Sequence, residues 1–171
     1  GSEMCIRDST YAARCNTDLL PVIARARELA AGRPLLGAGI SLGGTMLLNA
    51  CLTGPGVLDG LFCASSPLDL AACSASIERP RNRVYQRWLL QRLVRQTLAD
   101  PFGVSELEET SLTGSSTPRT ILDFDSAVTA PRWGFADVWG YYREASPLHH
   151  LVKSQHRMPK TLLLQAEDDP W

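Results

Sequence analysis

A short apolar run that leads into a glycine-flanked serine constrains the fold of this chain more than any other feature. Residues 34–40 read PLLGAGI, as expected for a parallel strand buried on both faces, and Leu42–Leu52 reads as a helix. Ser41 lies at the joint, within the pentapeptide GISLG. Glycines two residues to either side let a strand turn sharply into a helix, which strains the serine backbone and exposes its hydroxyl. The sequence therefore predicts that Ser41 is a nucleophile.

The residues that follow Ser41 fit the same chemistry. The N–H of Leu42 lies at the positive end of the predicted helix, where it can donate to a developing oxyanion. Gly44 permits close packing of helix and strand. The alternative is a Gly/Ser turn that caps a helix and has no chemical role. Its position between a buried strand and a helix favours the nucleophile.

Helices and strands alternate through the first part of the chain. An apolar stripe predicts a helix at Asp18–Ala31, which is followed by the strand at 34–40 and the helix at Leu42–Leu52. Val57–Ala64 is a second candidate for a buried strand. This alternation is typical of an α/β fold with a parallel sheet.

The pattern changes after residue 69. No convincing strand appears before Met158, and the clearest helices are expected at Arg81–Ala99 and Phe135–Ala145. An apolar strand returns at Pro159–Gln165. The expected organisation is a core part at residues 10–69, a helical insertion at 70–158, a core strand with its turn at 159–171, and a tag, junction or misread end at 1–9.

Two adjacent carboxylates follow the last predicted strand. Serine hydrolases of an α/β sheet carry their triad in the order serine, acid, histidine, with the acid on a turn after a later strand. Asp168 and Asp169 occupy such a turn, although paired carboxylates also occur in ordinary solvated turns. We favour Asp169 as the acid because a residue before proline is held extended, which suits a carboxylate that must orient a histidine.

The histidine of such a triad is expected beyond Trp171. A serine hydroxyl needs a positioned base to take its proton, and His149, His150 and His156 all precede the acid. Their sequence predicts a surface helix, so each is only an alternative base. The second oxyanion donor is expected upstream of the serine. We therefore expect no turnover from this chain by itself.

Composition excludes several classes of partner. The formal net charge of −1 gives no field that would favour nucleic acid, and no apolar run approaches the ~18 residues of a membrane helix. The five cysteines are odd in number and form no CxxC pair, which predicts reduced thiols and an intracellular setting, with membrane association through upstream sequence as the alternative. We expect neither a metal nor an organic cofactor.

Three stretches carry a specific resemblance to a known family. They read GISLGG at 39–44, RVYQRWLL at 83–90 and RTILDFDSAVTAPRWGFADVWGYYREASPL at 119–148, and a strand with AEDDP follows them. Over residues 16–171 the chain resembles the YheT-type α/β hydrolases, which include eukaryotic abhydrolase-domain lipases and phospholipases. The resemblance implies an α/β-hydrolase fold with a partial sheet, and an esterase or acylglycerol or phospholipid lipase with Ser41 as nucleophile and Asp169 as acid.

The resemblance also implies that residues 70–158 form a helical cap over the active site. Aromatic residues are dense there, and we expect them to pack the cap, with acyl-chain contact as the alternative: Phe124, Trp133, Phe135, Trp139, Tyr141 and Tyr142. Five arginines make the long helix basic: Arg81, Arg83, Arg87, Arg92 and Arg95. A solvated face is expected, with headgroup or membrane contact as the alternative. A non-catalytic α/β-hydrolase-like binding module is the rival function.

Overall fold

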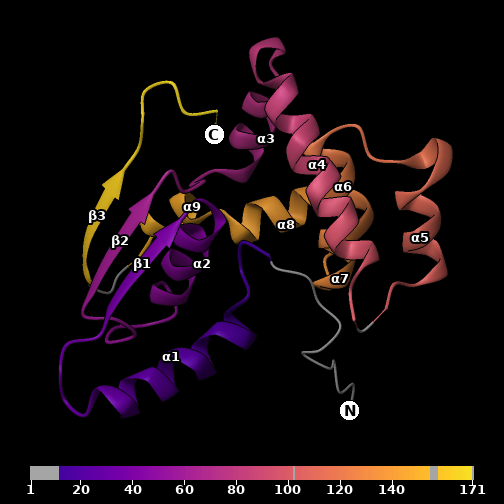
Figure 1. Ribbon diagram of the computed structural model, residues 1–171. Helices are drawn as coiled ribbons and strands as arrows, with labels where there is room; N and C mark the ends of the chain where they lie inside the picture. The colour runs from indigo at the N-terminus through magenta and orange to yellow at the C-terminus, as the bar shows by residue number, and fades with distance from the viewer. Residues whose placement is uncertain (1–11, 102, 155–157, 171) are drawn as a thin grey trace. The chain divides into compact units, whose positions relative to one another are not determined.

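The computed structural model describes residues 12–101, 103–154 and 158–170 (Figure 1). These residues form two compact units. The sheet unit comprises residues 12–73 and 142–170, and the helical unit comprises residues 74–141. The segment 1–9, expected to be a tag or junction, lies outside the described residues. No described helix has both the length and the apolar character needed to span a bilayer.

Three parallel strands form the centre of the sheet unit. They are β1 (Leu36–Ile40), β2 (Gly60–Ala64) and β3 (Lys160–Leu164), in the order β1-β2-β3. Ile40, Ala64 and Leu164 lie in one row of the register. Each strand falls within a predicted apolar run and begins later than predicted. The predicted α/β class with a parallel sheet is confirmed.

Two helices pack on one face of β1 and β2. They are α1 (Asn16–Ala30) and α2 (Leu42–Cys51), both within a residue or two of their predicted bounds. Their buried side chains, such as Ile23 and Leu48, form one core with Leu61 and Cys63 of β2. Because side chains alternate between the two faces of a strand, Leu61 and Cys63 point to the same face.

The opposite face of the sheet is open to solvent. Leu36 and Ile40 of β1 are 71% and 74% exposed, and Leu162 and Leu164 of β3 are 63% and 59% exposed. The register places all four on one face. The burial on both faces predicted for the strand at 34–40 is therefore wrong for β1, because α1 and α2 pack on the face of Leu61 and Cys63. Every residue of β2 is buried or half-buried.

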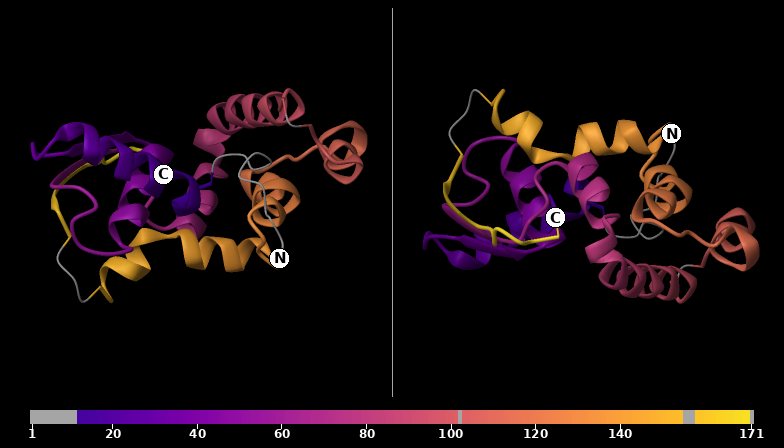
Figure 2. Two further views of the ribbon diagram at one scale, coloured as in Figure 1. Left: turned by 90° about the horizontal axis from the view of Figure 1, so that it is seen from below. Right: turned by 90° about the horizontal axis from the view of Figure 1, so that it is seen from above.

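The helical unit contains no strand among residues 74–101 and 103–141. After a 3-10 turn at Pro80–Asn82, its longest helix is α4 (Arg83–Leu98) (Figure 2). This helix contacts α5 and α6. The other helices of this unit are α5 (Glu106–Leu112), α6 (Ile121–Phe124) and α7 (Ala130–Arg132), with a 3-10 turn at Gly114–Ser116 and a π-helical stretch at Asp125–Thr129.

A buried arginine joins the parts of the helical unit. The guanidinium of Arg132 is 6% exposed and pairs with Asp100 at 2.8 Å and with Glu108 of α5. Burial opposes ionisation of Glu108, but hydrogen bonds from Arg132 and Ser105 hold the pKa of its carboxyl below the usual value. Such pairs are costly to break because the remaining charge stays buried.

Three further helices lie at the boundaries of the insertion. They are α3 (Leu70–Ile77), α8 (Val138–Ala145) and α9 (Pro147–Leu151). The helix predicted from Phe135 begins at Val138 because the Asp137 carboxylate accepts a hydrogen bond from the Gly140 N–H at 2.7 Å, as an N-cap residue does.

Candidate active site

Ser41 occupies a strained turn between β1 and α2. Its φ is 52° and its ψ is −132°, a region that non-glycine residues rarely adopt. The Ser41 N–H donates to the carbonyl of Ala64 at 2.8 Å, and the Ser41 carbonyl accepts from the Gly44 N–H at 3.0 Å. The backbone is therefore held from β2 on one side and from the first turn of α2 on the other. The strain predicted at Ser41 is present, and its role as nucleophile stays a prediction.

Two glycines let the strand and the helix approach each other. A Cβ added to Gly39 would lie 2.5 Å from the backbone N and Cα of Gly44, and a Cβ on Gly44 would lie 1.9 Å from the Ser66 hydroxyl oxygen. Gly43 differs, since a Cβ there would meet nothing within 4 Å. Packing at this turn thus requires glycine at positions 39 and 44 but not at 43.

Leu42 is the first residue of α2 and is half-buried. Its N–H is among the first four of the helix, which have no acceptor within the helix. The helix dipole adds a partial positive charge at this end. The Leu42 N–H can therefore donate to an anion that forms beside Ser41.

The first turn of α2 is anchored on the loop after β2. The buried Thr45 hydroxyl donates to the Pro67 carbonyl at 2.7 Å, and the buried side chain of Ser66 packs against Gly44. Ser65 has a positive φ of 49°, and its N–H donates to the Leu164 carbonyl of β3 at 2.8 Å. Sequence reasoning missed these anchors, for which the only signal was a polar Ser-Ser-Pro turn at the end of a predicted strand.

Asp168 and Asp169 follow β3 at the same edge of the sheet as Ser41 (Figure 1). Asp168 is exposed, whereas Asp169 is half-buried and its N–H donates to the Ala166 carbonyl at 3.3 Å. Burial raises the pKa of the Cys73 thiol, and the charge of Asp169 contributes to that rise. Asp169 therefore lies within electrostatic range of Cys73 in α3.

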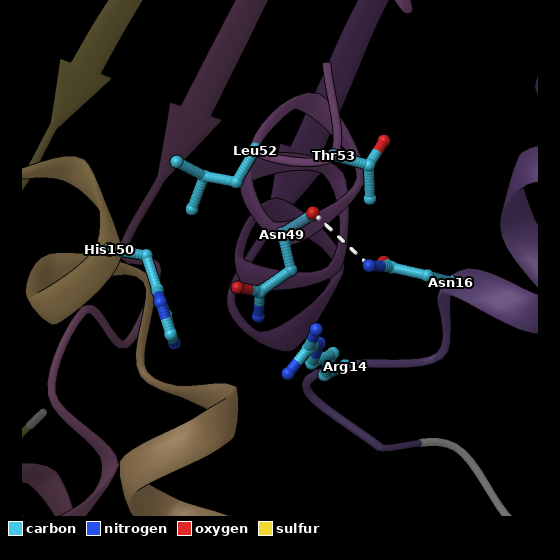
Figure 3. A pocket seen from close by; sticks show the side chains of 6 residues that line it. All are labelled: Arg14, Asn16, Asn49, Leu52, Thr53 and His150. Atoms are coloured by element: carbon cyan, nitrogen blue, oxygen red, sulfur yellow. Dashed lines mark hydrogen bonds between the residues drawn. The ribbon is translucent and has the colours of Figure 1, made fainter. Parts of the chain in front are cut away.

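The described histidine side chains do not gather at Ser41. His150 borders a small polar cavity of about 100 Å³ together with Asn49, Leu52 and Thr53 (Figure 3), and its Nε2 lies 3.0 Å from the Glu144 carbonyl oxygen. Asn49 is eight residues after Ser41, so this cavity lies about 12 Å further along the α2 axis. His149 is exposed, and His156 lies outside the described residues.

Asn49 holds the far end of α2. Its side-chain amide donates to the Ala13 and Ala145 carbonyls at 2.8 Å each, and its own carbonyl accepts from Asn16 at 3.3 Å. The residue is 3% exposed. Three segments distant in sequence are thus joined at the end of α2 opposite Ser41.

The described cysteines do not compete with Ser41 as nucleophiles. Cys15, Cys51, Cys63 and Cys73 are buried free thiols. Burial raises the pKa of Cys51 to about 11 and also raises that of Cys63, so both stay protonated near neutral pH. Within the described ranges, no group of three or more His, Cys, Asp or Glu residues could hold a metal ion.

Comparison with known proteins identifies several relatives. The chain is 35% identical over 143 residues to the putative esterase YheT of Escherichia coli, covering 81% of this chain and 40% of that protein. It is 29% identical over 177 residues to phospholipase ABHD3 of Mus musculus, covering 98% of this chain and 40% of that protein. It is 28% identical over 155 residues to phospholipase ABHD3 of Homo sapiens, covering 85% of this chain and 36% of that protein.

The chain thus spans about two fifths of the length of these relatives. No family model matches the sequence. No solved structure matches it either.

Proposed function

This chain belongs to the α/β-hydrolase family of its YheT and ABHD3 relatives, and from that we propose that its full-length protein is a serine hydrolase that cleaves carboxylic esters of lipid-like molecules. The observation that carries the proposal is the turn at Ser41. A strained serine stands between a strand and a helix, with the N–H of Leu42 beside it. Asp169 follows a strand of the same sheet at the same edge.

The proposed reaction proceeds through an acyl-enzyme. A histidine base takes the proton of Ser41 while Oγ attacks the ester carbonyl carbon, and the resulting oxyanion accepts a hydrogen bond from the Leu42 N–H. The C–O bond to the leaving alcohol then breaks, and the protonated base gives its proton to that alcohol. Water, deprotonated by the same base, attacks the acyl carbon, which releases the acid and restores Ser41.

In this proposal Asp169 accepts a hydrogen bond from the base and stabilises its charged form. His150 lies beside Asn49 at the far end of α2, so the proposal assigns the base to a histidine other than His150. The Leu42 N–H supplies one hydrogen bond to the oxyanion, and the proposal assigns the second to a donor outside this turn.

We also propose that the helices between β2 and β3 act as a cap that binds the acyl part of the substrate. Their support is the sequence order, since an all-helical stretch lies between β2 and β3, the strand that precedes the candidate acid. Trp139 is 56% exposed in this insertion. Trp139→Ala in the full-length protein should raise KM for long-chain esters more than for short ones, with kcat largely unchanged. Equal effects on all chain lengths would refute acyl contact at Trp139.

Covalent labelling tests the nucleophile. A fluorophosphonate should label the full-length protein at Ser41, and Ser41→Ala should abolish the labelling. Ser65→Ala is the matched control, because Ser65 is also a positive-φ serine at this edge, and it should still be labelled. Labelling that persists in Ser41→Ala and disappears in Ser65→Ala would transfer the role to Ser65. No labelling of the native protein would favour a binding module.

Turnover tests the acid. Asp169→Asn should lower kcat by roughly 10³–10⁴-fold, because an asparagine cannot stabilise the charged base. Asp168→Asn, one residue earlier and exposed, should lower it by less than tenfold. The reverse ranking would assign the role to Asp168.

A further inference from the structure

The exposed surface of α4 concentrates positive charge. Residues 79–98 contain six arginines and no acidic residue, although the whole chain has a formal net charge of −1. No salt bridge within the described part of the chain engages any of the six. The arginines are Arg79, Arg81, Arg83, Arg87, Arg92 and Arg95.

The buried side of α4 is already occupied. Gln86, Leu90 and Thr97 are 7%, 6% and 2% exposed, and the Gln86 side chain accepts a hydrogen bond from the Ile121 N–H of α6 at 3.4 Å. The arginines of α4 are exposed, and Arg83, Arg87 and Arg95 border the same groove as Gln86 and Leu90. The charge is therefore available to a partner without movement of the helix.

A groove runs along this charged surface. It measures about 880 Å³, lies between α4 and the segment Thr117–Thr120, and is lined by Arg83, Arg87 and Arg95 on one side and Arg119 on the other. The carboxylate of Glu78 also lines it. Guanidinium groups bind phosphate and carboxylate oxygens through paired hydrogen bonds, so the groove suits anionic groups.

Apolar and aromatic side chains are exposed next to the arginines. Val84 is 84% exposed, Trp88 49% and Tyr85 38%. The Tyr85 and Trp88 rings stack with centroids 5.9 Å apart, and the Arg92 guanidinium lies 4.4 Å from the Trp88 ring centre. A soluble anion would gain nothing from this exposed apolar area, and the Trp88 faces that a nucleic-acid base would need are engaged by these two neighbours.

We propose that the exposed face of α4 docks on an anionic phospholipid surface. Exposed arginines beside tryptophan and tyrosine are the composition of helices that lie in the membrane interface. The arginines of the groove take lipid phosphate and carboxylate groups, while Val84 and Trp88 enter the headgroup region. This docking needs neither Ser41 nor Asp169, so it stands or fails independently of the proposed hydrolysis.

Vesicle co-sedimentation of the full chain tests the docking. Binding to phosphatidylcholine vesicles that contain phosphatidylserine should exceed binding to phosphatidylcholine alone and should weaken as salt is added. Each arginine near an anionic surface contributes roughly fivefold to partitioning, so the triple variant Arg83→Gln/Arg87→Gln/Arg95→Gln should lower it by about two orders of magnitude.

A matched control removes the same charge elsewhere. The triple variant Arg25→Gln/Arg33→Gln/Arg143→Gln replaces three exposed arginines of the sheet unit and should lower binding only a few-fold. All variants should retain the native circular dichroism spectrum because the replaced side chains are exposed. An equal loss in the control, or equal binding to neutral vesicles, would overturn the proposal.

Tryptophan fluorescence supplies an independent measurement. Anionic vesicles should shift the emission to shorter wavelength, and Trp88→Phe should remove most of this shift while the protein still sediments with the vesicles. A shift that survives in Trp88→Phe would contradict insertion at Trp88. Binding of a single-stranded oligonucleotide without binding of vesicles would assign the surface to nucleic acid and overturn the proposal.

Discussion

The two turns that carry the candidate nucleophile and the candidate acid are held very differently. The turn at Ser41 is enclosed by Gly39, Gly44 and Ser66 at contact distance and is hydrogen-bonded to the neighbouring strand. The turn at Asp168 and Asp169 follows an edge strand whose five residues are all exposed. Within this turn the Asp169 N–H donates to the Ala166 carbonyl at 3.3 Å.

This contrast separates two requirements of a catalytic site. A nucleophile in a rare backbone conformation needs surroundings that leave it no alternative, because strain of about 1–3 kcal/mol must be offset elsewhere. A carboxylate that orients a histidine base has an ordinary backbone conformation. It needs only to lie within hydrogen-bonding distance of that base. The first requirement is met within the sheet unit, and the second depends on contacts of the complete site.

The largest expected effect comes from a glycine of the serine turn. Gly39→Ala should destabilise the chain by about 3 kcal/mol or more, since the new Cβ would collide with the Gly44 backbone, which cannot rotate away. Gly43→Ala is the matched control. It meets open space and should be neutral or stabilising by up to about 1 kcal/mol, because alanine favours a helix. Urea unfolding of both variants measures this, and similar losses would show that packing does not determine the turn.

A smaller effect is expected at the anchor on the β2 loop. Thr45→Val keeps the side-chain volume but leaves the buried Pro67 carbonyl without its hydrogen bond, which should cost about 1–3 kcal/mol. Thr53→Val removes a bond of equal length, 2.7 Å to the Ala50 carbonyl, at an exposed position and should cost less than about 0.5 kcal/mol. Thermal melts compare the two. Equal shifts in Tm would contradict the anchoring role of Thr45.

Strain at Ser41 predicts a gain in stability of about 1 kcal/mol. Ser41→Gly relieves about 1–3 kcal/mol of backbone strain and loses about 0.5–1 kcal/mol through the greater freedom of glycine in the unfolded chain. Ser41→Ala retains the Cβ and should retain the strain. Urea unfolding should therefore rank the glycine variant above the alanine variant, and the opposite order would show that the turn is unstrained.

The smallest effect is expected at the acid turn. Asp168→Asn should change stability by less than about 0.5 kcal/mol, as is usual for an exposed position, and Asp169→Asn, at a half-buried position, by less than about 1 kcal/mol. The same urea titration tests them. A loss above about 1 kcal/mol at Asp169 would mean that this turn is packed as firmly as the turn at Ser41, and the contrast between the two would disappear.

The serine turn was predictable from sequence because its requirements are local. The glycines at positions 39 and 44 and the strand and helix beside them lie within a few residues of Ser41. The anchors Thr45 to Pro67 and Ser65 to Leu164 are long-range, and a single sequence carries no sign of such pairings. The position of Asp169 was predicted from the order of elements along the chain. That order predicted the edge of the sheet at which Asp169 lies, but not that Asp169 lies near Cys73.

Burial was the least predictable property of the strands. Apolar composition indicated cover on both faces of the strand at 34–40, whereas Leu36 and Ile40 of β1 are exposed. Apolar composition indicates that a strand is suited to burial, but it does not indicate which segment of the chain packs on it. The bounds of α1 and α2 were better predicted, because the periodicity that defines a helix lies in neighbouring residues.

The open face of the sheet governs how this chain would behave when it is produced by itself. Exposed apolar side chains and an unpaired strand edge can both bind a second copy of the chain. Association between copies therefore competes with folding. Holdase chaperones recognise the same kind of surface. The yield of native chain in a cell then depends on whether Ile40 and Leu164 are buried faster than the copies associate. It depends less on the free energy of unfolding of the folded unit.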